Sequence, residues 1–396
     1  MFEIIDEKRD GAVIKVIGVG GCGGNAVEHM IHKGVAGVEF IAANTDAQVL
    51  DKNPAPKRIP LGAELTQGLG AGAKPEVGRD AAMESKLAVQ EAIRGADMLF
   101  ITAGMGGGTG TGAAPIIAQL AKEMGILVVA VVTKPFRFEM QKRERAAQAG
   151  IDELQRHVDS LIVVPNEKLI QVLGRNISLP AAFAASNDVL HGAVAGISEI
   201  INKRGLVNRD FADVRTIMSE LGMAMMGTAT ASGENRGKVA AMAAIKSPLL
   251  EDVDLQGARG VLLNITSSSN VELGELYDVT DTVAEFVSAD ATVLWGHVID
   301  DEMGDEMRVT MVATGLGAKK KMTSVQGGLA NVLRTELVSS GLRTGTDNHV
   351  VTATVGAVET IAATGAVDYD LPPGTRGRQS GGRSLEIPTF LRKQAD

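Results

Sequence analysis

The sequence predicts an α/β fold: a doubly wound parallel-sheet domain, joined by a long central helix to a smaller α/β domain. Three observations predict it. Short continuous apolar runs alternate with helical stretches from residue 13 to residue 165, which is typical of parallel strands covered on both faces. Glycine makes up 47 of 396 residues and clusters where these runs end; about 7% would be usual. A long amphipathic stretch at 178–203 then precedes a second group of strands.

The first half of the chain contains five expected strands, each rich in β-branched or other apolar residues. Helical sequences follow the first and third of them, at 25–33 and 114–124. Because parallel strands need a crossover connection, this alternation predicts a parallel sheet with helices on both faces. The expected strands are 13–19, 38–43, 98–103, 126–133 and 160–165.

One long helix is expected from Ser178 to Lys203. Ser178 suits the N-cap, Pro180 suits the first turn, and Gly205 would end the helix. Beyond it, further strands and helical stretches predict a second, smaller α/β domain. The strands are expected at 260–266, 291–299 and 307–314, and the helical stretches at 241–245 and 273–286.

These elements give the expected domain boundaries. The first domain spans 1–177, the central helix 178–205 and the second domain 206–317. The Thr-, Ser- and Gly-rich segment 318–383 is expected to be a flexible linker. The final segment, 384–396, regains apolar residues followed by basic ones, which is typical of a docking peptide.

Composition excludes several classes of protein. The net charge is −9, from 39 basic and 48 acidic residues, so binding to nucleic acid by bulk electrostatics is not expected. Cys22 is the single cysteine, which excludes disulfides within one chain and Cys-rich zinc sites. The N-terminal segment has no apolar core, and the longest obvious apolar run, 126–132, is far shorter than the roughly 20 residues of a membrane span. We expect a soluble cytoplasmic protein without direct membrane insertion.

Two glycine-rich turns indicate the kind of ligand that the protein binds. Gly18–Gly24 satisfies G-x-G-x-x-G between an expected strand and helix, and Gly104–Gly112 lies in the same context with two threonines, Thr109 and Thr111. A tight strand–helix turn would explain the first but not the second. Two such turns at the carboxyl ends of strands in one sheet indicate a single di- or triphosphate site. A third turn, 68–73, could close over a terminal phosphate. The standard P-loop motif is absent from the sequence.

The motifs together resemble a known family. Residues 106–112 read GGGTGTG, and VIGVGGCGGNAV, NTDAQVL and DFADVRTIMSELGMAMMG occur in the right order around it. In these segments the chain resembles bacterial cell-division members of the tubulin/FtsZ family of GTPases, over residues 10–317 and again at the C-terminus. The resemblance implies GTP or GDP as ligand, Mg²⁺ as cofactor, head-to-tail filaments at the mid-cell division site, and a tail, Leu385–Asp396, that binds membrane-tethering and regulatory division proteins.

The resemblance also implies the nucleotide contacts. Those around phosphate would be Gly20, Gly21, Gly104, Gly106, Gly107, Gly108, Thr109 and Gly110. Further contacts would come from Asn44, Gly72, Ala73 and Thr133, and ribose contacts from Glu139 and Arg143. The guanine pocket would be formed by Asn25, Asn166, Phe183, Asn187 and Asp188. The residues themselves agree for one pair: Phe183 and Asn187 are four apart on the long helix, so a ring and an amide share a face.

An acidic segment opens the second domain. Asp210 and Asp213 are three apart, so both carboxylates project from one side of a helix start. On their own, such acids favour the helix N-terminus electrostatically. The resemblance implies a catalytic role for them and for Asn208: this segment of one subunit completes the nucleotide site of the next, so that hydrolysis depends on assembly.

Three departures from the family pattern concern the site. Lys74 stands where a small polar residue is expected, Met140 where glycine usually follows Phe-Glu, and Arg209 where an apolar residue is usual.

Two other interpretations of the sequence stay open. An NAD(P)-dependent oxidoreductase would use Gly18–Gly23 but leaves the second turn unexplained. A filament protein that binds GTP without hydrolysing it leaves the acidic pair unexplained.

Overall fold

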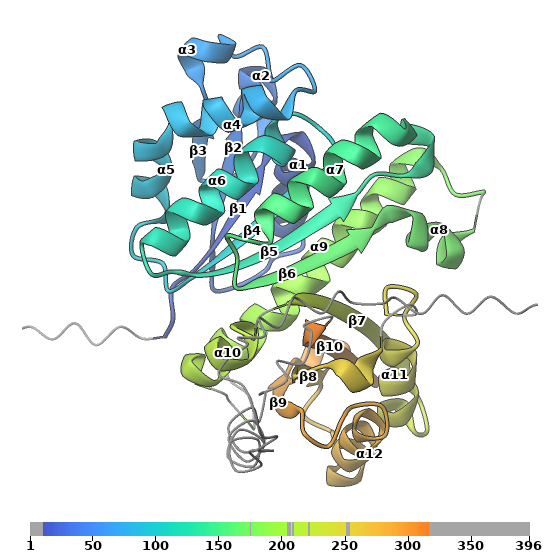
Figure 1. Cartoon of the computed structure of the whole chain (residues 1–396). Coiled ribbons are helices and arrows are strands. Elements are labelled where there is room, and N and C mark those ends of the chain that lie inside the picture. The colour runs from blue at the N-terminus through green and yellow to red at the C-terminus, as the bar shows by residue number, and fades with distance from the viewer. Residues whose placement is uncertain are drawn as a thin grey trace, which may run out of the picture. The chain divides into compact units, whose positions relative to one another are not determined.

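The computed structural model describes residues 11–174, 176–203, 207, 210–220, 222–250 and 254–316 (Figure 1). Several sequence predictions therefore lie outside the described residues. These are the linker at 318–383, the docking peptide at 384–396, and the assignments of Gly205, Asn208 and Arg209. The proposed domain boundaries stay predictions.

The described strands form one sheet in the order β3-β2-β1-β4-β5-β6-β7-β10-β8-β9. Its first six strands run parallel, and their order reverses between the neighbours β1 and β4. In doubly wound sheets, ligands bind at such a switch point, outside the carboxyl ends of the strands. The predicted parallel sheet is confirmed. These strands are β1 (Ile14–Val19), β2 (Val38–Asn44), β3 (Lys57–Pro60), β4 (Met98–Gly104), β5 (Leu127–Lys134) and β6 (Ser160–Pro165).

Helices cover both faces of this parallel part. On one face a core joins Ile17 and Val19 to α4 (Pro75–Glu84), α5 (Lys86–Ile93), α6 (Thr109–Glu123) and α7 (Met140–Leu154). On the other face a second core joins Ile14 and Val16 to α1 (Gly20–His32) and α9 (Leu179–Asn202). The alternation along β1 is the period-2 pattern of a strand buried on both sides. Shorter helices are α2 (Ala47–Lys52), α3 (Ala63–Thr66), η1 (Arg137–Glu139) and α8 (Asn166–Leu173).

The predicted central helix is α9. Ser178 caps it, since its Oγ accepts the N–H of Ala181 at 3.3 Å, and Pro180 lies in the first turn. Both details confirm the sequence prediction. The 24 residues of the helix extend about 36 Å at ~1.5 Å per residue. Its two ends therefore lie in different parts of the molecule.

The second half continues the same sheet in mixed directions. β10 (Glu306–Leu316) is antiparallel to β7 (Met223–Ser232) and to β8 (Gly260–Ser267), and β8 is parallel to β9 (Thr292–Ile299). β7 also pairs with β6 through two residue pairs. A third core joins these strands to two helices. The helices of this half are α10 (Phe211–Met218), α11 (Arg236–Ile245) and α12 (Leu273–Ala284), with η2 (Leu255–Gly257) and η3 (Asp301–Met303).

Candidate nucleotide-binding site

Two helices begin side by side at the carboxyl edge of the parallel sheet. α1 starts directly after β1 and α6 starts shortly after β4, and these strands are paired with Val19 opposite Ala103. No side chain caps either helix start, so backbone N–H groups there are available to an anion. The sequence predicts loops at 18–24 and 104–112. In the structure many of these residues instead form the first turns of helices, which aligns their N–H groups.

The missing side chains let these turns interlock. A Cβ on Gly20 would lie 3.0 Å from the nitrogen of Gly110, and one on Gly110 would lie 2.7 Å from the oxygen of Gly104. A Cβ on Gly104 would lie 2.6 Å from that of Cys22. Approaches this short leave no room for a side chain in a close-packed interior. These glycines therefore bring the two helix starts together.

The third predicted turn, 68–73, lies against the residues that follow β2 and against the second glycine turn. The N–H of Gly70 donates to the carbonyl of Thr45 at 3.1 Å. A Cβ on Gly108 would lie 2.8 Å from the Cβ of Ala71, so the backbone of the second turn packs against a side chain of the third. All three glycine-rich turns thus belong to one region, as a single phosphate site requires. The exposed residues of the third turn are Leu69, Gly72 and Ala73, and the last two have a left-handed backbone.

The threonine hydroxyls divide into two roles. The Oγ1 atoms of Thr45 and Thr109 lie 2.6 Å apart, which ties the end of β2 to the start of α6. Thr111 is 3% exposed, and its Oγ1 accepts the N–H of Gly106 at 2.8 Å. The sequence predicts both Thr109 and Thr111 near phosphate, whereas the structure uses the Thr111 hydroxyl inside the protein to hold the glycine turn.

Two further predicted contacts are buried at strand ends. Asn44 ends β2, and its Oδ1 accepts the N–H of Asp46 at 3.3 Å. Thr133 lies near the end of β5 with its Oγ1 at 3.7 Å from the Sγ of Cys22. Burial raises the pKa of the Cys22 thiol above its ordinary value. The thiol therefore stays neutral at pH 7 and adds no negative charge beside the glycine turns.

The two predicted ribose contacts form an ion pair. Arg143 Nη1 lies 2.7 Å from Glu139 Oε2, one helical turn away. The other carboxylate oxygen of Glu139 accepts the N–H of Phe136 at 3.0 Å. The Glu139 side chain is 12% exposed and that of Arg143 is 51% exposed. The carboxylate is thus fixed in place, whereas the guanidinium faces solvent.

An aromatic and polar cluster occupies the start of α9. Phe183 is 40% exposed and meets the buried Phe136 edge to face, with ring centroids 5.4 Å apart. Asn166 is buried, and its Oδ1 accepts the Ser186 hydroxyl at 2.8 Å. Asn187 is partly exposed, one turn after Phe183. A supported, half-open ring beside an available amide can stack on and read a nucleobase.

Asp188 has different surroundings. Its carboxylate lies 2.7 Å from His29 Nε2 and 3.7 Å from Lys33 Nζ, both on α1. Burial lowers the pKa of the adjacent His191. Asp188 therefore joins α9 to α1, and its predicted place in the base pocket stays a prediction. The remaining predicted base contact, Asn25, is exposed on α1.

The predicted acidic pair lies elsewhere. Asp210 immediately precedes α10 and Asp213 lies in its first turn, both exposed. The guanidinium of Arg215 donates to the carbonyl of Gly125 at 2.9 Å, and Gly125 comes just before the amino end of β5. α10 thus lies at the opposite edge of the sheet from the glycine turns (Figure 1).

Two family models match the chain. Residues 13–174 match the GTPase domain of the Tubulin/FtsZ family, and residues 222–317 match the C-terminal domain of the FtsZ family. The chain belongs to the tubulin/FtsZ family. It is an FtsZ-type member, because full-length relatives carry that name. The Pseudomonas aeruginosa cell division protein FtsZ is 54% identical over the full length of both chains. That of Coxiella burnetii is 59% identical over 80% of this chain and 82% of its own.

A solved FtsZ structure confirms the fold class. The protein titled "FtsZ dimer, empty" from M. jannaschii is 42% identical, with a TM-score of 0.75 over 79% of this chain and 90% of its own. The FtsZ resemblance predicted from the glycine and acidic motifs is therefore confirmed. The individual site assignments stay predictions.

Two residues of this FtsZ-type site are not singled out by sequence reasoning. Thr45 meets Thr109 and Phe136 supports Phe183. Thr45 stands between Asn44 and Asp46 at a strand end, so its position in the sequence could have identified it as a site residue. Nothing in the sequence around Phe136 indicates its supporting role. Among the described residues, no group of three His, Cys, Asp or Glu side chains could hold a metal ion, and no helix is long and apolar enough to cross a membrane.

Proposed function

We propose that this FtsZ-family protein binds and hydrolyses GTP, and that it assembles head-to-tail into filaments of the cell-division ring. The phosphates bind the N–H groups at the starts of α1 and α6. Glu139 and Arg143 contact the ribose. The base stacks on Phe183 and is read by Asn187. The acidic residues at α10 act on a nucleotide held by the neighbouring subunit.

One observation supports the proposed head-to-tail assembly. The glycine turns and the acidic pair lie at opposite edges of the sheet, and β5 alone separates these edges by about 26 Å at ~3.3 Å per residue. An aspartate side chain cannot reach across that distance to a γ-phosphate on its own subunit. If Asp210 and Asp213 are catalytic, they must therefore serve a second subunit, and a contact of this kind that does not close yields a filament.

Exposed apolar side chains near the glycine turns and on the second half of the chain support such a contact. Near the glycine turns, Leu69 is 80% and Phe138 is 53% exposed. On the second half, Leu273 is 69% and Tyr277 is 60% exposed. Burying surfaces of this kind between subunits is favourable at about 25 cal/mol per Å², so assembly removes apolar area that the monomer leaves in water.

In the proposed reaction, Asp210 and Asp213 orient a water molecule and accept its proton as it attacks the γ-phosphate. The N–H groups of the glycine turns stabilise charge on the phosphate oxygens. Mg²⁺, when bound, offsets phosphate charge. Mg²⁺ is commonly held by phosphate oxygens, water and one or two carboxylates. Asp46, which is partly exposed and caps α2 by accepting the N–H of Val49 at 3.1 Å, would supply one carboxylate.

The first test is GTP turnover against protein concentration. A site shared between subunits requires turnover per molecule to rise steeply above an assembly threshold that light scattering detects. Turnover per molecule that stays constant through that threshold would contradict the shared site. A phosphate-release assay also separates this function from GTP binding without hydrolysis, and competition with NADH separates it from an oxidoreductase.

Asp213→Ala provides the second test. Asp213 is exposed on the first turn of α10, so the variant folds and keeps its own nucleotide pocket. We expect GTP affinity within about twofold of wild type and turnover reduced by roughly 10²-fold or more, the usual scale for removing an acid–base group. A variant that no longer binds GTP would show that the acid belongs to the pocket of its own subunit.

We also propose that Leu385–Asp396 binds membrane-tethering and regulatory division proteins, with Ile387, Phe390 and Leu391 as apolar anchors. The support is the apolar and basic composition of the segment. Removing 385–396 should abolish capture by such partners and leave GTP turnover in solution unchanged. Retained capture would overturn this assignment.

A further inference from the structure

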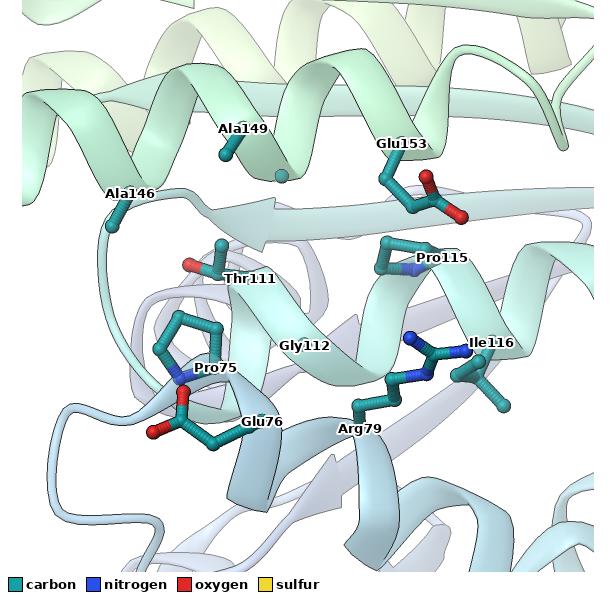
Figure 2. Close-up of a pocket in the computed structure, with 11 residues that line it drawn as sticks. Pro75, Glu76, Arg79, Thr111, Gly112, Pro115, Ile116, Ala146, Ala149 and Glu153 are labelled. Atoms are coloured by element: carbon teal, nitrogen blue, oxygen red, sulfur yellow. The ribbon is translucent and has the colours of Figure 1, made fainter.

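A pocket of about 310 Å³ opens between α4, α6 and α7 (Figure 2). Its walls are mostly apolar: Pro75 comes from α4, Pro115 and Ile116 from α6, and Ala146 and Ala149 from α7. None of these residues belongs to the predicted nucleotide site. The volume lies at the lower end of the range typical of small-molecule sites.

Three charged side chains complete the lining. Two of them have a charged or helix-dipole partner in the protein, and one does not. Glu153 lies 2.9 Å from Arg156 and 3.4 Å from His157. Glu76 lies in the first turn of α4, where a carboxylate interacts favourably with the helix N-terminus. Arg79 is exposed, and its guanidinium forms no hydrogen bond or ion pair within the described part of the chain. Its guanidinium extends from α4 towards Pro115 (Figure 2).

We propose that this pocket binds a small, flat, apolar molecule that carries a carboxylate. The ring system would lie between the proline rings of Pro75 and Pro115 and the small residues Ala146 and Ala149, which leave space above them. The carboxylate would pair with Arg79, because a guanidinium binds a carboxylate through two parallel hydrogen bonds. Glu153 already has two partners and Glu76 interacts with the start of α4, so both carboxylates are less available to a cation than Arg79 is to an anion.

The pocket shares Thr111 and Gly112 with the second glycine turn. Thr111 lines it and also accepts the N–H of Gly106 at 2.8 Å. A Cβ on Gly112 would lie 1.9 Å from the carbonyl oxygen of Pro75, and one on Gly150 would lie 2.4 Å from Cγ2 of Thr111. α4 and α6 therefore touch through backbone at this point, and the backbone of α7 meets the methyl group of Thr111. A bound molecule fixes their spacing and so couples to GTP affinity; this coupling rests on the proposed GTP binding.

The test titrates the full chain with 2-naphthoate and follows alanine methyl signals by NMR. We expect saturable binding with shifts at Ala146 and Ala149. The uncharged 2-naphthylmethanol should bind about tenfold more weakly, the scale of one charge-assisted pair. Arg79→Gln should weaken naphthoate to the level of the alcohol and leave the alcohol unchanged. Arg145→Gln, an exposed arginine of α7 outside the pocket, is the matched control.

A second pair of variants tests the location. Ala149 is exposed on α7, so Ala149→Leu fills the pocket without disturbing a core and should abolish binding of both probes. Ala88→Leu, at an exposed position of α5, should leave both unchanged. Absence of saturable naphthoate binding, or binding that survives Arg79→Gln or Ala149→Leu undiminished, would overturn the site.

GTP affinity with and without saturating naphthoate tests the coupling. We expect a change of about fivefold or more, the lower range of measured allosteric couplings. If Arg79→Gln and Ala149→Leu weaken naphthoate binding as expected but naphthoate does not change GTP affinity, the proposed coupling is wrong and the proposed binding site is supported. If the protein binds no GTP, the proposed function fails, and the naphthoate titration still decides the pocket.

Discussion

Met140 carries backbone strain beside the predicted ribose contacts. Its φ is 74° and its ψ is 158°, a region that is essentially restricted to glycine, and its side chain is 72% exposed. The sequence identifies Met140 as a departure from the family's glycine, and the structure gives that departure a physical meaning. A non-glycine residue in this region bears a conformational cost of about 1–3 kcal/mol.

We therefore predict that Met140→Gly stabilises the protein. Relief of the strain outweighs the roughly 0.5–1 kcal/mol entropy cost of glycine, for a net gain of about 1 kcal/mol. Thermal unfolding should shift upward by about 2 °C. Met83→Gly, at a 48% exposed position inside α4, is the control and should lose about 1 kcal/mol. Equal losses for the two variants would contradict the strain at Met140.

At the scale of elements, most of the parallel sheet could be predicted, and β7 could not. Its sequence, MAMMGTATAS, contains Gly227 and no Val, Ile, Leu or aromatic residue, so it lacks the residue types that usually identify a strand. The structure explains this composition. A Cβ on Gly227 would lie 2.0 Å from the carbonyl oxygen of Ala244 in α11. Position 227 must be glycine because a helix packs directly on the strand backbone there, and that contact is not visible in local sequence.

One ion pair holds α11 against α12. Arg236 is the first residue of α11, with its guanidinium at 2.7 and 3.0 Å from the two carboxylate oxygens of Glu275 in α12. It also donates to Asn270 at 3.0 Å. The hydrogen bonds from Arg236 hold the pKa of Glu275 below its ordinary value. The ionised carboxylate is therefore the form that stabilises the fold.

The sign of the pH dependence follows. A carboxyl with a depressed folded-state pKa contributes stability above its unfolded pKa, and this contribution is lost as pH falls through the folded value. We predict that Glu275→Gln lowers the free energy of unfolding by about 2 kcal/mol at pH 7, the scale of charged hydrogen bonds. The difference from wild type should shrink as pH falls below about 4. Urea unfolding measures both.

Glu285→Gln is the matched control, because Glu285 is exposed at the other end of α12 and has no ion pair within the described residues. Glu285→Gln should change the free energy of unfolding little, both at pH 7 and below about pH 4. A constant difference between Glu275→Gln and wild type across this range would mean that the loss does not arise from the carboxylate charge.

At the scale of the whole molecule, sequence motifs identify the parts of the site but not the distance between them. The glycine turns and the acidic pair are both recognisable in the chain, yet nothing in their spacing shows that a β-strand and a 24-residue helix hold them at opposite edges of the sheet. That separation is a property of the fold. It is also what makes a site within one subunit unworkable for the proposed reaction.

Mixing two inactive variants tests this separation directly. Asp213→Ala keeps an intact pocket, and the double variant Phe183→Ala/Asn187→Ala keeps intact acids. Each alone should lack turnover. In an equal mixture, a head-to-tail contact places an intact pocket on intact acids in about one case in four, so turnover should return to about a quarter of wild type. Sedimentation should first establish that both variants enter the same filaments. Turnover that stays at background in such co-filaments would show that the acids do not act on the neighbouring subunit's nucleotide.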